Sequence, residues 1–288
     1  MKGFVLPGFS EKFKVNKKLI ELYQHEPYRF YDDIKFDCFY GIFGYCIWCG
    51  GRVFSSYDRG YYEDLVSLKE FYESYNIPIR LTFTNPLITE EHLYDKYSNM
   101  IVATLQNGNN EILTASPILE QYLKENYPDY KYCSSTTKCL TTPEAVKTEL
   151  NSNYFQVCLD YNMNHNMTLL NSLNDEEKNK CEFLCNAICP PGCPNRKEHY
   201  RLNGVAMLNG GKAFEVNCGI KYNTLNVETC NYKNNISPEE IIETYEPLGF
   251  SHFKLEGRTW PDSELACNYV RYLIKPEYHL ETIHILLS

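Results

Sequence analysis

Short apolar runs typical of β-strands alternate along this chain with segments that begin like capped α-helices. Such alternation is typical of α/β folds, in which helices cover a sheet of parallel strands. The eight expected strands are Ile34–Tyr40, Ile79–Thr84, Glu111–Thr114, Lys131–Ser135, Phe155–Asp160, Glu182–Ile188, Phe214–Cys218 and Ser251–Glu256. Eight strands with intervening helices predict a (β/α)8 TIM-like barrel, with some irregularity. An open doubly wound sheet is the alternative, but the chain lacks the glycine-rich dinucleotide fingerprint that would favour it.

Three of the expected helices have recognisable start signals. Ser116, Thr142 and Ser237 each place a capping hydroxyl directly before a proline, which is favoured at the first helical position. Glu240 follows Ser237 at the spacing of a capping box. The segment Glu63–Tyr75 repeats its apolar residues at helical spacing. These signals support the alternation on which the barrel prediction rests.

The length of 288 residues suits one large α/β domain, and no internal repeat or linker divides it. We expect an N-terminal extension over residues 1–30, packed on a barrel over residues 31–276, and a C-terminal tail over residues 277–288. The N-terminus has no apolar stretch long enough for a signal peptide. No run of the chain reaches the ~18 apolar residues of a membrane span. We therefore expect a cytoplasmic protein without a membrane span.

The formal net charge of −9 argues against a protein that coats nucleic acid, since phosphate contacts need an excess of lysine and arginine. Two local basic stretches, Lys12–Lys18 and Arg196–Arg201, leave an RNA substrate open. A small molecule or a tethered substrate agrees better with the overall charge.

Thirteen cysteines are unusual for a chain of this length. Without a secretion signal they do not predict a disulfide scaffold. Cys181, Cys185, Cys189 and Cys193 recur every four residues, and the Pro-Pro-Gly sequence after Cys189 prevents one continuous helix. We expect a strand that ends at Cys189 and a turn that folds Cys193 back, which places thiols at the carboxyl end of the barrel.

Three interpretations of this cysteine segment remain open: buried core cysteines, a zinc site, or an iron–sulfur cluster. A cluster tolerates irregular spacing but needs four thiolates. Cys46, Cys49 and Cys218 are candidates for the remaining ligand because each lies near an expected strand end.

Short motifs resemble peptidase family U32, the collagenase-like peptidases. Phe253–Arg258 reads FKLEGR and resembles the family's Phe-Lys-Ile-Glu-Gly-Arg signature. Leu184–Cys193 occupies the place of the family's cluster-binding cysteines and keeps the Ala-hydrophobic-Cys ending, without the preceding His-Gly. Cys49–Arg52 is similar to a Cys-x-x-Arg turn of one ubiquinone-hydroxylating member. The family's usual first-strand and Ser-Gly-Arg-Cys patterns are absent, so the resemblance implies a divergent branch.

The resemblance implies a barrel that holds a 4Fe-4S cluster, with zinc as the alternative metal. The ligand role carries over to Cys49, Cys185, Cys189 and Cys193, with Cys181 as a further candidate. Family members support oxygen-independent hydroxylation of ubiquinone precursors or RNA bases, with prephenate as the oxygen donor. The resemblance also implies an electron donor and a homologous barrel as partners.

Arginines near strand ends are candidate catalytic residues. Arg80 lies on an apolar strand and must be paired or bind an anion if it points inward. A structural ion pair with Asp37 or Glu256 and a clamp for a substrate carboxylate are both consistent with this position. Arg52 and Arg258 each follow a strand end and are candidates for the same clamp.

Other polar residues could carry acid–base chemistry. Glu256 ends the last expected strand and could be a general acid or base, or the partner of Arg258 or Lys254. His199 follows the cysteine segment and could donate a proton, although a lone histidine is more often structural. Tyr40 also lies at the expected barrel mouth.

The leading hypothesis is an iron–sulfur barrel enzyme that hydroxylates or otherwise modifies its substrate without oxygen. The first alternative is a non-catalytic, metal-stabilised subunit of a heteromeric complex. It gains support if Arg80, Arg258 and His199 do not converge on one cavity. The second alternative is a U32-type peptidase, although the chain has neither a Gly-x-Ser-x-Gly elbow nor a His-Glu-x-x-His helix.

Overall fold

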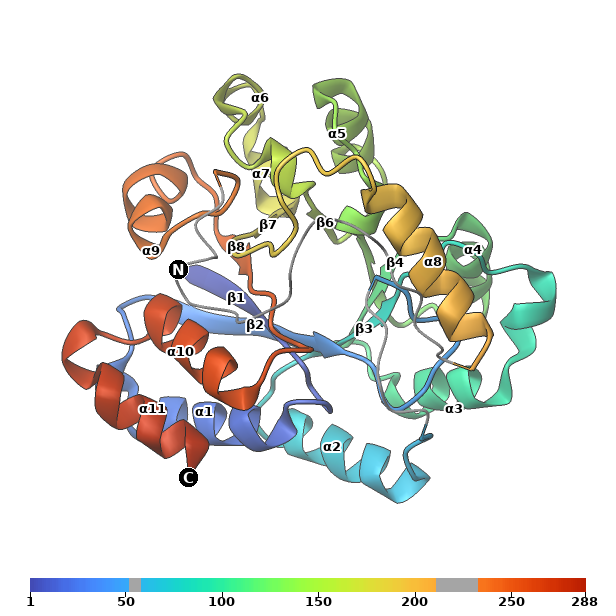
Figure 1. Ribbon diagram of the computed structural model, residues 1–288, viewed down its shortest axis with the longest axis horizontal. Helices are drawn as coiled ribbons and strands as arrows, with labels where there is room; N and C mark the ends of the chain where they lie inside the picture. The colour runs from blue at the N-terminus through green and yellow to red at the C-terminus, as the bar shows by residue number, and fades with distance from the viewer. Residues whose placement is uncertain (52–57, 211–232) are drawn as a thin grey trace.

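Eight parallel strands form a closed barrel in a computed structural model that describes residues 1–51, 58–210 and 233–288. Each strand pairs with the next one in sequence, and β8 pairs with β1 to close the ring. Helices surround the strands (Figure 1), so the TIM-like barrel prediction is confirmed. The strands are β1 Lys2–Pro7, β2 Ile34–Gly41, β3 Ile79–Phe83, β4 Glu111–Thr114, β5 Lys131–Ser134, β6 Gln156–Cys158, β7 Cys181–Leu184 and β8 His252–Lys254.

The N-terminal segment differs from expectation. Residues 1–30 do not form an extension, because β1 is the first barrel strand and pairs with both β2 and β8. The side chains of Phe4 and Leu6 pack into the main hydrophobic core, whereas Val5 lies in a small cluster with Cys38 and Tyr40. The expected strand at Phe214–Cys218 lies outside the described residues.

The helices begin where the capping signals predicted. Ser116 and Thr142 accept backbone hydrogen bonds at the starts of α4 and α5, and Ser237 forms a capping box with Glu240 at the start of α9. The helices are α1 Phe13–His25, α2 Tyr62–Ser74, α3 Lys96–Leu105, α4 Pro117–Asn126, α5 Pro143–Leu150, α6 Met167–Asn171, α7 Asp175–Lys180, α8 Arg196–Leu208, α9 Pro238–Glu240 with a π-helical turn over Ile241–Tyr245, α10 Asp262–Leu273 and α11 His279–Leu287.

The C-terminal segment belongs to the helical layer of the barrel. α11 packs against α1 and α10, and the three helices lie side by side in Figure 1. Arg29 fixes this arrangement, since its Nη1 and Nη2 atoms donate to the Glu281 carboxylate at 2.7 and 2.9 Å. Residues 277–288 therefore continue the fold and are not a separate tail. In the described parts of the chain, no helix is long and apolar enough to span a membrane.

Candidate functional site

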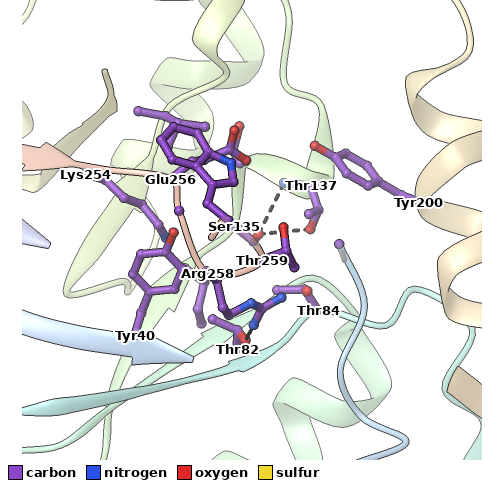
Figure 2. Close-up of a pocket in the computed structure, with 16 residues that line it drawn as sticks. Tyr40, Thr82, Thr84, Ser135, Thr137, Tyr200, Lys254, Glu256, Arg258 and Thr259 are labelled. Carbon is purple, nitrogen blue, oxygen red and sulfur yellow. Dashed lines mark hydrogen bonds between the residues drawn. The ribbon is translucent and has the colours of Figure 1, made fainter. Parts of the chain in front are cut away.

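An open pocket lies at the carboxyl ends of the barrel strands (Figure 2). TIM barrels carry their chemistry at this end. Its walls combine two cations, one carboxylate, several hydroxyls and three large aromatic rings. Sixteen described residues line it: Tyr40, Gly51, Thr82, Thr84, Leu113, Ser135, Thr136, Thr137, Leu184, Tyr200, Lys254, Glu256, Gly257, Arg258, Thr259 and Trp260.

Arg258 contributes a buried guanidinium to the pocket wall. Its Nη1 atom donates to Thr82 Oγ1 at 2.6 Å, and Thr82 Oγ1 donates in turn to the Gly41 carbonyl at 3.1 Å. Glu11 Oε1 lies 3.7 Å from Arg258 Nε. Burial raises the pKa of Glu11 and so favours the neutral form of this carboxyl group. Arg258 has the opposite effect but does not outweigh burial.

Lys254 lies beside Arg258 on the same wall (Figure 2) and is only 5% exposed. Its Nζ atom lies 3.4 Å from Glu182 Oε1 and 4.3 Å from the centre of the Tyr40 ring. The Tyr40 hydroxyl donates to the Leu255 carbonyl at 2.8 Å, which holds the ring in place. The ammonium group is thus placed between a carboxylate and an aromatic face at the base of the pocket.

Glu256 joins the pocket wall to the loop after β7. Ile188 N donates to Glu256 Oε2 at 2.9 Å. The Asn186 side chain accepts from Glu256 N at 2.6 Å and donates to Glu256 O at 3.1 Å. These bonds end β7 at Leu184, because Asn186 pairs with the backbone after β8 through its side chain. The prediction that this strand continues to Ile188 is therefore wrong.

Arg196 anchors α8 beside the pocket. In the sequence it was notable only as part of the basic stretch Arg196–Arg201. Arg196 donates to Asp160 Oδ2, and its Nη2 atom donates to the Thr136 carbonyl at 2.8 Å. The guanidinium also stacks on Tyr161, 4.0 Å from the ring centre. This anchor brings Tyr200 of α8 to the pocket that Thr136 also lines. The interacting groups come from different strand ends, so no local sequence signal marks them.

Arg80 lies inside the barrel and does not line the pocket. It is fully buried, and its Nε and Nη2 atoms donate to Glu111 Oε2 and Gln156 Oε1 at 2.6 Å each. Its Nη1 atom donates to Glu182. The expected ion pair is present, but its partners are Glu111 and Glu182 instead of Asp37 or Glu256. All three nitrogens bind protein oxygens, which favours a structural role over a substrate clamp.

Of the other candidates, Glu256 and Arg258 line the pocket, whereas His199 does not. His199 lies on α8 one residue before Tyr200, and it is Tyr200 that lines the cavity. Arg52 lies outside the described residues. Of Arg80, Arg258 and His199, whose convergence would count against the subunit alternative, only Arg258 lines this pocket.

The cysteines of the loop after β7 point in different directions. Successive residues of β7 point to opposite sides of the strand. Glu182 and Leu184 face the barrel interior, whereas Phe183 and Cys185 belong to the main hydrophobic core. Burial raises the pKa of Cys185 well above its usual value. Cys189 belongs to a separate small cluster with Leu184. The expectation that Cys185 and Cys189 share one face is wrong, because β7 ends before strand alternation could align them.

Cys49 is buried beside Cys46, whose Sγ atom lies 3.2 Å from Ser98 Oγ of α3, and Cys193 is half-buried in the loop before α8. Among the described residues, no three or more His, Cys, Asp or Glu side chains are placed to hold a metal ion. The described residues therefore do not gather Cys49, Cys185, Cys189 and Cys193 at one metal site, and the 4Fe-4S cluster or zinc ion stays a prediction. Cys218 lies outside the described residues.

Comparison with known proteins gives one informative match. No family model and no curated protein matches this chain. A solved structure described as "The Structure of the U32 Peptidase Mk0906" is similar with a TM-score of 0.51 and 15% sequence identity, over 79% of this chain and 87% of the other. In fold, this chain resembles a U32 peptidase. The relation expected from FKLEGR is thus confirmed for the fold alone.

Proposed function

We propose that this chain binds a small carboxylate-bearing ligand, either an organic acid or the C-terminus of a peptide, in the pocket at the carboxyl end of the barrel. The observation that supports this proposal is the pair of nearly buried cations, Lys254 and Arg258, on one wall of an open pocket. A buried cation that lines a cavity is stabilised by an anion that enters it.

The surrounding groups suit such a ligand. A planar guanidinium can donate two parallel hydrogen bonds to a carboxylate, and Thr82 orients the guanidinium of Arg258 from one side. Hydroxyl groups of Ser135 and Thr137 line the pocket and can bind further polar atoms of the ligand. The Trp260 ring supplies an apolar wall.

Isothermal titration calorimetry with paired ligands tests the proposal. Short peptides and small organic acids are titrated into the full chain beside the matching C-terminal amides and primary amides. We expect the acids to bind at least about tenfold more tightly than the amides, because loss of one charge-assisted hydrogen-bonded contact costs roughly 1.5–3 kcal/mol. Equal affinity for each pair, or no binding of any acid, would overturn the proposal.

The fold relation to a U32 peptidase favours peptide hydrolysis as a second candidate function. Glu256 is the carboxylate among the described pocket-lining residues, so it is our candidate general base. It would take a proton from a water molecule whose oxygen attacks the peptide carbonyl. The C–N bond then breaks, and the proton passes to the departing amine.

Mass spectrometry of peptides incubated with the protein tests this second candidate. New termini should appear with wild-type protein and disappear with Glu256→Gln, whose amide oxygen can still accept from Ile188 N. Cleavage that continues in Glu256→Gln would contradict the role of Glu256. Binding without cleavage would leave the carboxylate site as the function and would favour a non-catalytic subunit.

A further inference from the structure

The environment of Lys254 differs from that of the other buried cations. An ammonium group carries three donors, and burial without acceptors is costly. Lys254 is 95% buried, yet its Nζ atom makes no hydrogen bond to the described residues. Its charged contact within them is Glu182 Oε1 at 3.4 Å. By contrast, Arg80 and Arg196 each donate hydrogen bonds from all three guanidinium nitrogens.

The position of this nitrogen is also suited to reaction. Lys254 lines the open pocket, so a ligand bound there meets its side chain. The Tyr40 ring packs at 4.3 Å and limits the conformations of the lysine side chain. Arg258 follows four residues later on the same wall (Figure 2). A ligand whose carboxylate binds Arg258 would therefore present its neighbouring atoms toward Lys254.

We infer that Lys254 is a nucleophile that forms an imine with the carbonyl carbon of a 2-oxo acid bound in this pocket. The inference rests on the proposed carboxylate site and names its substrate class, because a 2-oxo acid carries a carbonyl directly beside its carboxylate. Proteins use desolvated lysine amines, or lysines next to another cationic group, for this chemistry, and Lys254 is buried beside Arg258.

The step balances without a metal or a redox partner. Lys254 loses one proton to solvent in the open pocket, and its neutral Nζ attacks the carbonyl carbon. The C=O double bond becomes a carbinolamine C–OH group, which takes up a proton and leaves as water. The product is a protonated imine with the same single positive charge as the starting ammonium. Glu182 therefore keeps a cationic partner before and after the reaction.

Reductive trapping tests the inference on the full-length chain. Pyruvate is added with sodium cyanoborohydride, and intact mass is measured before peptide mapping. We expect one adduct per chain, heavier by the mass of pyruvate less one oxygen, at Lys254. Lactate, which has the carboxylate but no carbonyl, should bind in calorimetry and give no adduct.

Lys254→Arg is the matched variant, because arginine keeps the positive charge beside Glu182. It should lose the adduct while its thermal melt is preserved. Lys17→Arg, on the exposed face of α1, should trap like wild type. If Lys254→Arg does not fold, the peptide map of the wild-type adduct still decides the site.

The outcomes separate this inference from the proposed function. Pyruvate that binds without a trapped adduct overturns the imine and leaves the carboxylate site intact. Adducts spread over surface lysines, and equal in Lys254→Arg, also overturn the imine. Failure of every 2-oxo acid and every other carboxylate to bind overturns both.

Discussion

Two polar regions occupy the barrel, and they differ in how well their charges are satisfied. In the interior, Arg80 donates from all three nitrogens to Glu111, Gln156 and Glu182. At the mouth, Arg258 has a threonine hydroxyl and a carboxylate 3.7 Å away, and Lys254 has one carboxylate at 3.4 Å. Both regions are buried, so burial alone does not mark a functional site. Lys254, which makes no hydrogen bond within the described residues, lies where a ligand can reach it.

The carboxyl groups of the two regions show the same contrast. Burial raises the pKa of Glu182, but Arg80 and Lys254 outweigh burial, so the pKa of Glu182 is lowered. Near the mouth, burial outweighs Arg258, and the pKa of Glu11 is raised. In the interior the ion pairs outweigh burial, whereas near the mouth burial outweighs the ion pair of Glu11 with Arg258.

Replacing Arg80 should give the largest effect. Arg80→Met would leave the Glu111 and Glu182 carboxylates buried without a guanidinium, which we expect to cost roughly 3–5 kcal/mol of unfolding free energy. Urea unfolding monitored by circular dichroism measures this loss. Arg201→Met, which removes an exposed pair with Glu198, is the matched control and should leave the urea midpoint nearly unchanged. Similar midpoints for the two variants would show that the interior network is dispensable.

The lowered pKa of Glu182 predicts an acid-sensitive part of the stability. A carboxyl group with a folded-state pKa below its unfolded value stabilises the fold at higher pH, and this contribution is lost as pH falls through the folded pKa. As pH falls from ~7 into the acid range, we expect wild type to lose more unfolding free energy than Glu182→Gln. Unfolding free energies across this range provide the measurement, and parallel curves would refute the assignment.

Arg258→Gln tests the mouth without disturbing the interior. We expect affinity for a carboxylate ligand to fall by about tenfold or more, because the guanidinium contact is lost. Arg258→Lys keeps the positive charge but loses the planar guanidinium. Its affinity for the carboxylate ligand should therefore lie between those of Arg258→Gln and wild type. Calorimetry at neutral pH measures both. If Arg258→Gln binds as wild type does, the ligand does not use Arg258.

Glu11→Gln should have the smallest effect and the opposite sign. Above the raised pKa of Glu11, its ionised carboxylate competes with the ligand for Arg258. Removing that charge should raise carboxylate affinity by about two- to threefold, as expected for a modest ion pair. The difference between variant and wild type should vanish at lower pH, where Glu11 is neutral. A pH series of binding isotherms checks both points.

Much of the fold could be predicted because strand and helix signals are local. The hydroxyl–proline starts at Ser116, Thr142 and Ser237 mark real helices, and the alternation of elements gives the barrel. β1 escaped prediction because its apolar run, Phe4–Leu6, is short and ends at a proline. Its pairing with β2 and with the distant β8 identifies it as a barrel strand.

The candidate site could be predicted only in part. Glu256 and Arg258 follow β8 directly, so their position at the mouth follows from the strand itself. The partners of Arg80 lie on three other strands, and the end of β7 depends on a tertiary contact of Asn186. The spacing of the cysteines could not reveal that Cys185 packs into the main hydrophobic core. These outcomes depend on contacts between distant residues, which spacing in the sequence does not encode.

The exchange of hydrogen bonds between Asn186 and Glu256 has a kinetic consequence. We expect it to couple the loop after β7 to the Lys254–Arg258 wall, because Asn186 binds the backbone of Glu256 and the Glu256 carboxylate accepts from Ile188 N. Escape of a bound ligand past this wall would require both segments to shift together. We therefore expect the residence time of a ligand bound in this pocket to be sensitive to Asn186, a side chain outside the pocket lining.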